Sequence, residues 1–277
     1  MIKIVVDSGC DVNDKMRNEY KIEVVPLTVQ IDESSFFDDE NFDVENLMAK
    51  MEQGSDVKSA VPSPKAFLES FKGDESVFTV AINSVLSGSY NSASLAKKMY
   101  FEEVGQKFIH IFDSKGLSIC ETVIALKINE LANLNLPDSE IVDDVNKFIE
   151  QQKFFFILER FDNLVKTGRM SPVIAKIATF LNVYPICTVN RDTLKIEMFD
   201  KARGFKKSLN KLITTLESEN HNFEDRILGI THVKCIDRAN YVKDELLKKF
   251  KFKDVIILES MGVSTMYADK GGILISF

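Results

Sequence analysis

The sequence predicts an α/β protein with two domains. We expect residues 1–153 to form an N-terminal three-layer α/β/α domain with a mainly parallel sheet, and residues 154–277 to form a C-terminal α/β domain with a mixed sheet of about six strands. A chain of 277 residues, 45% of them apolar, has enough material for two buried cores. Predicted strands alternate with helices up to about residue 153, whereas strand candidates crowd together beyond it.

The first half alternates strands with helices. It begins with the apolar run IKIVV at residues 2–6, which is typical of a strand buried on both faces. A second strand is predicted at 22–31, interrupted or at a sheet edge because Pro26 cannot donate to a ladder. Asp43 is the predicted N-cap of a helix that runs to Gly54. Two more strands are predicted at 76–82 and 107–113, and each is followed by helical sequence. A further helix is predicted at 138–152. This order indicates parallel strands with right-handed crossovers.

The second half has a different pattern. Only the residues NRD, at 190–192, separate two of its strand candidates, so these two strands are expected to pair as an antiparallel hairpin. Helical stretches are predicted at about 160–181, 203–219 and 236–250. The strand candidates are 154–159, 183–189, 193–199, 226–233, 254–260 and 272–277.

Composition excludes several classes of function. The formal charge of −7 and the lack of a dense Lys/Arg block argue against a nucleic-acid partner. The four cysteines are far apart without CxxC spacing, so we expect them to be reduced and structural, with no metal site. Apolar runs are shorter than the ~20 residues of a membrane-spanning helix, and no signal peptide is evident. These features favour a cytoplasmic protein without a membrane span.

One strand-to-helix loop has an unusual number of hydroxyl groups. The segment NSVLSGSYNS, residues 83–92, contains Ser84, Ser87, Gly88 and Ser89. Loops at the carboxyl ends of parallel strands are common ligand sites, and the N–H groups of the following helix attract anions. The loop lacks the glycine pattern of a phosphate cradle, so it suits a carboxylate better than a nucleotide, and we expect no cofactor. The alternative is an ordinary serine-rich helix cap.

Three other polar positions are candidates for a site. Ser59 lies in a proline-stiffened loop before a predicted helix. Arg169 follows a helix that is expected to end at Thr167 with Gly168 as its C-cap, on an exposed turn. His232 ends a predicted strand, where a side chain can face a cleft. The alternatives are a helix start, a surface ion pair and a structural histidine, respectively.

The turn DSGCD after the first strand contains two carboxylates. Asp7, Ser8 and Asp11 could bind a cation, but further acidic ligands at a recognisable spacing are missing. A turn that links strand to helix is the favoured interpretation. Serine hydrolase chemistry is not supported by a motif, because the chain has no GxSxG elbow.

Seven segments, in order, resemble the DegV family. They are VDSGCDV, VPLTV, KSAVPSP, NSVLSGSYNSA, IFDSKGLS, LVKTGRMS and GITHVKCIDRA, and they span nearly the whole chain. The resemblance implies a two-domain α/β protein that binds one long-chain fatty acid between its domains. It also implies a binding subunit, without catalysis of its own, that presents the acyl carboxylate to a separate fatty acid kinase for acyl phosphate formation.

The resemblance also implies which residues bind the carboxylate. By position these are Ser59, Ser87, Gly88, Ser89 and Tyr267, with Ser84, Arg169 and His232 as secondary candidates and Arg203 as a residue that docks the kinase. Tyr267 departs from the family, which commonly has a histidine in that place. A phenol donates a hydrogen bond but is not a cation near neutral pH.

Tyr267 is expected in a C-terminal loop that folds over the cleft, with its hydroxyl within hydrogen-bond distance of the ligand head or of Ser59. The alternative is a loop aromatic that packs against Met266 with its hydroxyl in solvent. The expected partners are a long-chain fatty acid and no nucleic acid. A kinase subunit, and transient contact with a membrane to exchange lipid, are left open.

Two alternative functions remain open from the sequence. One is a serine-dependent hydrolase or acyltransferase that acts on a lipid-like substrate, with Ser87 or Ser59 as nucleophile and His232 or Tyr267 assisting. The other is a protein-interaction module with an incidental pocket.

Overall fold

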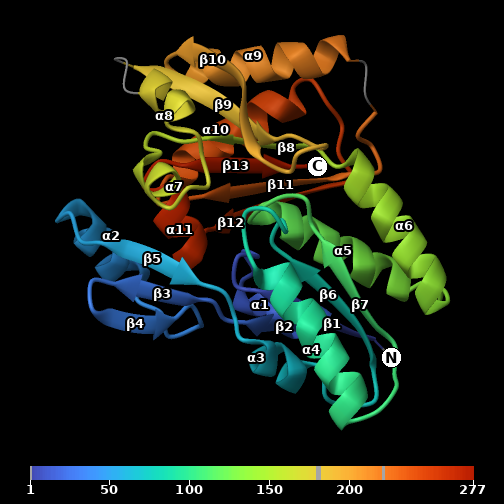
Figure 1. Cartoon of the computed structure of the whole chain (residues 1–277). Helices are drawn as coiled ribbons and strands as arrows, with labels where there is room; N and C mark the ends of the chain where they lie inside the picture. The colour runs from blue at the N-terminus through green and yellow to red at the C-terminus, as the bar shows by residue number, and fades with distance from the viewer. Residues whose placement is uncertain (1, 179–181, 220–221) are drawn as a thin grey trace.

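The computed structural model describes residues 2–178, 182–219 and 222–277 (Figure 1). Within these residues the strands form three sheets. The first has the order β2-β1-β6-β7, and all of its neighbouring strands are parallel, as predicted. Its strands are β1 (Ile2–Asp7), β2 (Ile22–Val25), β6 (Ser76–Ala81) and β7 (Ile109–Asp113).

Helices cover both faces of this parallel sheet, which confirms the three-layer prediction. In β6, Phe78 and Val80 belong to the core on the α5 side, whereas Val77 belongs to the core under α3 and α4. This alternation is expected when every second side chain of a strand points to the same face. The helices are α1 (Asp14–Tyr20), α3 (Pro64–Ser70), α4 (Ser89–Glu103), α5 (Ile119–Ala132) and α6 (Asp138–Gln151).

A small antiparallel sheet lies beside the first one and was not predicted. Its order is β4-β3-β5, and α2 (Val44–Glu52) follows β4, with Asp43 as its N-cap. The single strand predicted at 22–31 is two strands in different sheets, because Pro26 interrupts the ladder. Ser59, expected in a loop, lies on a strand. The strands are β3 (Thr28–Ile31), β4 (Ser34–Phe37) and β5 (Val57–Ala60).

The third sheet has six strands in the order β10-β9-β8-β13-β11-β12. It is mixed, as predicted: β11 and β12 are parallel, and the other neighbours are antiparallel, including the expected β9–β10 hairpin. The amphipathic helices α9 (Phe205–Ser218) and α10 (Ile236–Leu247) pack on one face. The strands are β8 (Phe154–Ile157), β9 (Val183–Val189), β10 (Ile196–Arg203), β11 (Ile227–His232), β12 (Asp254–Glu259) and β13 (Ile273–Ser276).

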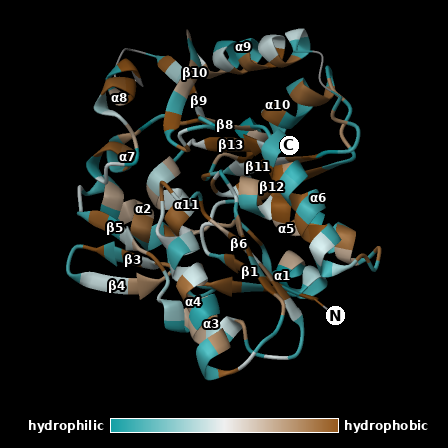
Figure 2. Ribbon diagram, turned by 45° about the vertical axis from the view of Figure 1, so that its right-hand side comes forward, coloured by the Kyte–Doolittle hydropathy of each residue, from teal (hydrophilic) through white to brown (hydrophobic). Residues whose placement is uncertain are grey.

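Helix α5 packs between the parallel sheet and the six-stranded sheet. It contacts β1 and β6 on one side and β11 and β13 on the other. Gly229 of β11 permits this approach, because a Cβ there would lie 2.5 Å from Ile119 and 2.8 Å from Val123 of α5. Figure 2 shows hydrophobic colours on β1 and β6 inside the molecule and hydrophilic colours on much of α9 at its edge.

Three short helices complete the fold. The helix predicted at 160–181 is two helices, α7 (Asp162–Lys166) and α8 (Pro172–Ala178), because Gly168 has a left-handed φ of 75° between them. Residues 179–181 of that prediction lie outside the described residues. Near the C-terminus, α11 (Gly262–Ala268) replaces the expected loop and packs with the three-stranded sheet. A domain boundary at 153/154 therefore stays a prediction, since α11 belongs to a core built mainly by earlier residues.

Candidate functional site

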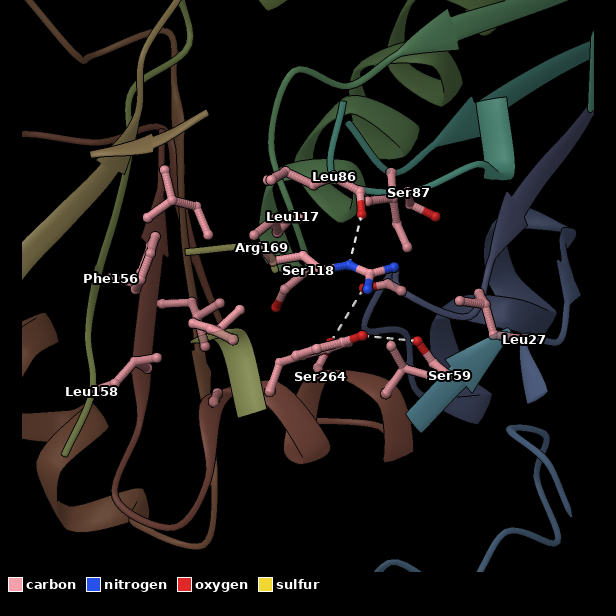
Figure 3. Close-up of a pocket in the computed structure, with 18 of the residues that line it drawn as sticks. Leu27, Ser59, Leu86, Ser87, Leu117, Ser118, Phe156, Leu158, Arg169 and Ser264 are labelled. Carbon is pink, nitrogen blue, oxygen red and sulfur yellow. Dashed lines mark hydrogen bonds between the residues drawn. The ribbon is translucent and has the colours of Figure 1, made fainter. Parts of the chain in front are cut away.

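A largely apolar cavity lies where the loops of the parallel sheet meet the six-stranded sheet, α7 and α11. It contains about 760 Å³ of empty space, part of it open to solvent. Figure 3 shows Phe156 and Leu158 at one end and the polar residues Ser59, Ser87 and Arg169 at the other. Such a shape suits a ligand with a long apolar part and one polar head.

The loop after β6 places Ser87 at the polar end. Asn83 is fully buried, and its Oδ1 accepts the backbone N–H groups of Val85 (2.9 Å) and Leu86 (3.3 Å). The carbonyl oxygen of Asn83 also accepts the N–H of Ser87 at 3.0 Å. These bonds form a tight turn in which Ser87 lines the cavity immediately before α4 begins.

Ser87 is connected to a buried carboxylate through Ser89. The Ser87 hydroxyl donates to Ser89 Oγ at 3.2 Å, and the Ser89 side chain in turn lies near enough to the Asp7 carboxylate to lower its pKa. Asp7 accepts the N–H groups of Gly9 (2.9 Å) and Ile82 (3.0 Å), which joins the carboxyl ends of β1 and β6. Burial raises the pKa of Asp7 to about 6, against the lowering effect of these hydrogen bonds.

Three other residues of this loop do not line the cavity. Ser89 is fully buried and faces Asp7, so it lies behind Ser87. Ser84 and Gly88 line a neighbouring groove instead. Space does not require glycine at position 88, because an added Cβ would make an ordinary 3.5 Å contact with Val61.

Ser59 and Tyr267 meet at the polar end. Their hydroxyl oxygens are 2.9 Å apart, and either group can be the donor. The hydrogen bond expected between them is therefore present, but Tyr267 lies in α11 and not in a loop. The alternative of a hydroxyl in solvent is wrong for this structure.

Two buried carboxylates hold the beginning of α11. Asp38 accepts the N–H groups of Gly262 (2.9 Å) and Val263 (3.0 Å), and Asp11 accepts that of Met261 (2.8 Å). Burial raises the pKa of both aspartates to about 6. The role expected for Asp11 was a turn between strand and helix, or a cation site. The structure shows that Asp11 also contacts the beginning of α11. Asp38 was not predicted from the sequence, because its partners lie more than 200 residues away.

Arg169 brings a positive charge to the cavity. α7 ends at Lys166, and the half-buried side chain of Arg169 points into the space between Ser87 and Ser59 (Figure 3). Its Nε donates to the carbonyl of Leu86 (3.2 Å) and its Nη1 to that of Thr167 (2.7 Å). Within the part of the chain that the structure describes, no carboxylate pairs with it. A guanidinium with only carbonyl partners suits an anionic ligand.

Two predicted residues lie away from the cavity. His232 is buried at the end of β11, where its Nδ1 accepts the N–H of Cys235 at 3.3 Å, and burial lowers its pKa. Arg203 is exposed at the end of β10. Among the described residues, no histidine, aspartate or glutamate lines the cavity, and no group of such side chains and cysteines is arranged to hold a metal ion.

Two residues of the polar end were not predicted. Ser118 and Ser264 line the cavity, and their hydroxyls bond the side chain of Asp11 and the carbonyl of Gly9, respectively. No local pattern marks either residue, since both are placed by partners distant in sequence. None of the described helices has the length and hydrophobicity needed to cross a bilayer.

Comparisons with known proteins found a matching family model and similar sequences and structures. A family model described as "Uncharacterised protein, DegV family" matches residues 1–277. A DegV domain-containing protein of Streptococcus pyogenes serotype M18 is 34% identical over 281 residues, which cover 99% of this chain and 98% of that protein.

Two solved structures share the fold over the whole chain. One is a DegV family protein from Ruminococcus gnavus refined with vaccenic acid, with 36% identity, a TM-score of 0.93 and coverage of 100% of this chain and 99% of that one. The other is the fatty acid kinase (Fak) B3 protein of Streptococcus pneumoniae loaded with linoleic acid, with 30% identity, a TM-score of 0.90 and the same coverage, 100% and 99%.

Proposed function

This chain belongs to the DegV family, and from this premise we propose that it binds one long-chain fatty acid in the cavity, with the carboxylate at the polar end. The observation that carries the proposal is Arg169, a cation without a carboxylate partner among the described residues, which lies between two hydroxyl-bearing residues at the end of an apolar cavity. The relatives from R. gnavus and S. pneumoniae, described with vaccenic and linoleic acid, support the same class of ligand.

The apolar wall supplies affinity in this proposal. Burying about 15 methylenes at roughly 0.8 kcal/mol each gives on the order of 12 kcal/mol of gross driving force. Estimates of the association cost run from about 4 to 15 kcal/mol, so this driving force exceeds the low estimates and is comparable to the high ones. The carboxylate must still be compensated where water is excluded. Arg169 and the hydroxyls of Ser59, Ser87 and Tyr267 provide that compensation.

We further propose that the protein performs no chemistry alone and presents the carboxylate to an ATP-dependent kinase, which places it in the cytoplasm. The description of the S. pneumoniae relative as a fatty acid kinase protein supports this role. Arg203 is the proposed docking residue, and the exposed Lys201, Lys206 and Lys207 lie beside it in sequence. The hydrolase alternative has less support, because His232 does not reach the cavity. Tyr267, the other expected assisting residue, does lie 2.9 Å from the Ser59 hydroxyl, but a phenol lacks the basic nitrogen of an imidazole.

Native mass spectrometry of gently purified protein tests fatty acid binding. We expect a mass increase that matches a C14–C18 fatty acid and that disappears after delipidation and returns when oleic acid is added. Incubation with a fluorophosphonate tests the hydrolase alternative, which requires a covalent adduct on Ser87 or Ser59. A protein that carries no lipid and takes up none contradicts the proposed function.

A further inference from the structure

The three-stranded sheet and its following turn contact α11 at both ends. Asp38, directly after β4, accepts the backbone N–H groups of Gly262 at 2.9 Å and Val263 at 3.0 Å, in the first turn of the helix. Ser59, on β5, contacts the Tyr267 hydroxyl at 2.9 Å in the last turn. One small structural unit therefore fixes both the start of α11 and the side chain near its end.

Asp38 is itself held firmly in this unit. Its backbone N–H donates to the carbonyl of Leu27 at 2.9 Å, and its side chain is fully buried. Both carboxylate oxygens are used by α11, one for each N–H group. A negative charge in the first turn also interacts favourably with the partial positive charge of a helix start.

The fit between Asp38 and α11 depends on Gly262. A Cβ at this position would lie 2.5 Å from Asp38 Oδ1 and 2.5 Å from the ring of Phe42. Val263 and Met266, on the same helix, pack in the core of the three-stranded sheet with Leu27. The helix therefore packs closely against Asp38, which accepts both N–H groups of its first turn. Asp11, Gly9 and Asn163 make the other polar contacts of this segment, to Met261, Ser264 and Met266, respectively.

Asp38 does not line the cavity, so it makes no direct contact with a ligand there. We propose that Asp38 is a positioning residue for the head-group site: it holds α11 so that Tyr267 and Ser59 present their hydroxyls together to the carboxylate. This inference deepens the proposed function and rests on it. It assigns a role to a carboxylate that lies more than 200 residues before the helix it positions.

The experiment measures the release of oleic acid from loaded protein. The variants are Asp38→Asn, Tyr267→Phe and the double variant, compared with the wild type. Asp39→Asn is the matched control, because the carboxylate of Asp39 accepts the nearby N–H of Asn41. We expect Tyr267→Phe and Asp38→Asn each to release the lipid roughly 2- to 10-fold faster, the range for one lost hydrogen bond. In the Tyr267→Phe background, Asp38→Asn should add nothing, and Asp39→Asn should behave like the wild type.

The double variant separates positioning from a general effect on the fold. If the two effects multiply, or if folded Asp38→Asn releases lipid at the wild-type rate, the inference is wrong. Should Asp38→Asn fold poorly, native mass spectrometry of its compact charge states measures occupancy in the folded fraction alone. Gly262→Ala then serves as a second variant, since it displaces α11 while keeping the carboxylate. A wild type that takes up no oleic acid instead contradicts the proposed function.

Discussion

Replacing Arg169 with methionine tests the proposed head-group site most directly. The change removes the positive charge at the polar end of the cavity and keeps a side chain of similar length. Among the residues that the structure describes, the guanidinium bonds only the carbonyls of Leu86 and Thr167. Both residues are half-buried, so water can replace it at these oxygens. We therefore expect the midpoint of thermal unfolding to change little.

The effect on binding should be much larger than the effect on folding. A hydrogen bond to a charged group contributes roughly 1.5–3 kcal/mol. At about 1.4 kcal/mol per tenfold change, the Kd for oleic acid should rise roughly 10- to 150-fold. Oleyl alcohol, which lacks the carboxylate, should bind the wild type and Arg169→Met with similar affinity.

Competition with a fluorescent fatty acid on delipidated protein measures both ligands. Arg160→Met is the matched control, because the Arg160 side chain is 63% exposed and its carboxylate partner, Asp269, lies 3.7 Å away. This control should bind oleic acid like the wild type. If folded Arg169→Met binds oleic acid within twofold of the wild type, the carboxylate does not lie at Arg169 and the reasoning fails.

Three other predictions concern the head group, the partner and pH. Ser87→Ala should retain less co-purified fatty acid, by roughly 1.5–3 kcal/mol of lost charge-assisted bonding, whereas Ser84→Ala, outside the cavity, should retain as much as the wild type. Arg203→Ala should lower acyl phosphate formation with a cognate kinase at unchanged lipid occupancy, and equal activity would remove Arg203 from the docking surface. Lowering the pH from 7.5 to 5 should raise the midpoint of thermal unfolding. Burial gives three carboxyl groups folded-state pKa values of about 6, above the usual 3.8. The stability that these groups contribute is therefore lost as the pH rises through 6 and regained as the pH falls. A midpoint that falls steadily over this range contradicts that assignment to Asp7, Asp11 and Asp38.

Local sequence patterns predicted most of the larger elements. The apolar run of β1, the hairpin of β9 and β10, and the N-cap Asp43 are each specified by residues close together in the chain. Their physical causes, burial on two faces, a short connection and a carboxylate that accepts a helix N–H, act over a few residues. The parallel character of the first sheet and the mixed character of the six-stranded sheet followed from these signals.

Elements that depend on distant partners were missed. The sequence of β4, SSFF, has all four residues exposed, so it carries no alternating pattern. α11 contains the β-branched residues Val263 and Thr265, and its start is held by Asp38 and Asp11. No local pattern could show these contacts.

The candidate site divides in the same way. Ser87 and Arg169 were found from a loop and a helix end, both local features, and the structure brings them to one cavity. His232 was not brought there, since a strand end has two faces and the sequence does not decide between them. Whether the site binds a carboxylate stays a prediction for the experiments above.

The packing of α11 has a consequence for the order of events during synthesis. The three-stranded sheet is complete once Ala60 has left the ribosome, but its core partner, α11, follows about 200 residues later. At translation rates of about 5–20 residues per second, the nascent sheet waits roughly 10–40 s with part of its apolar face uncovered. During this interval the uncovered apolar face is open to wrong pairing, and a chaperone that binds it would protect the segment.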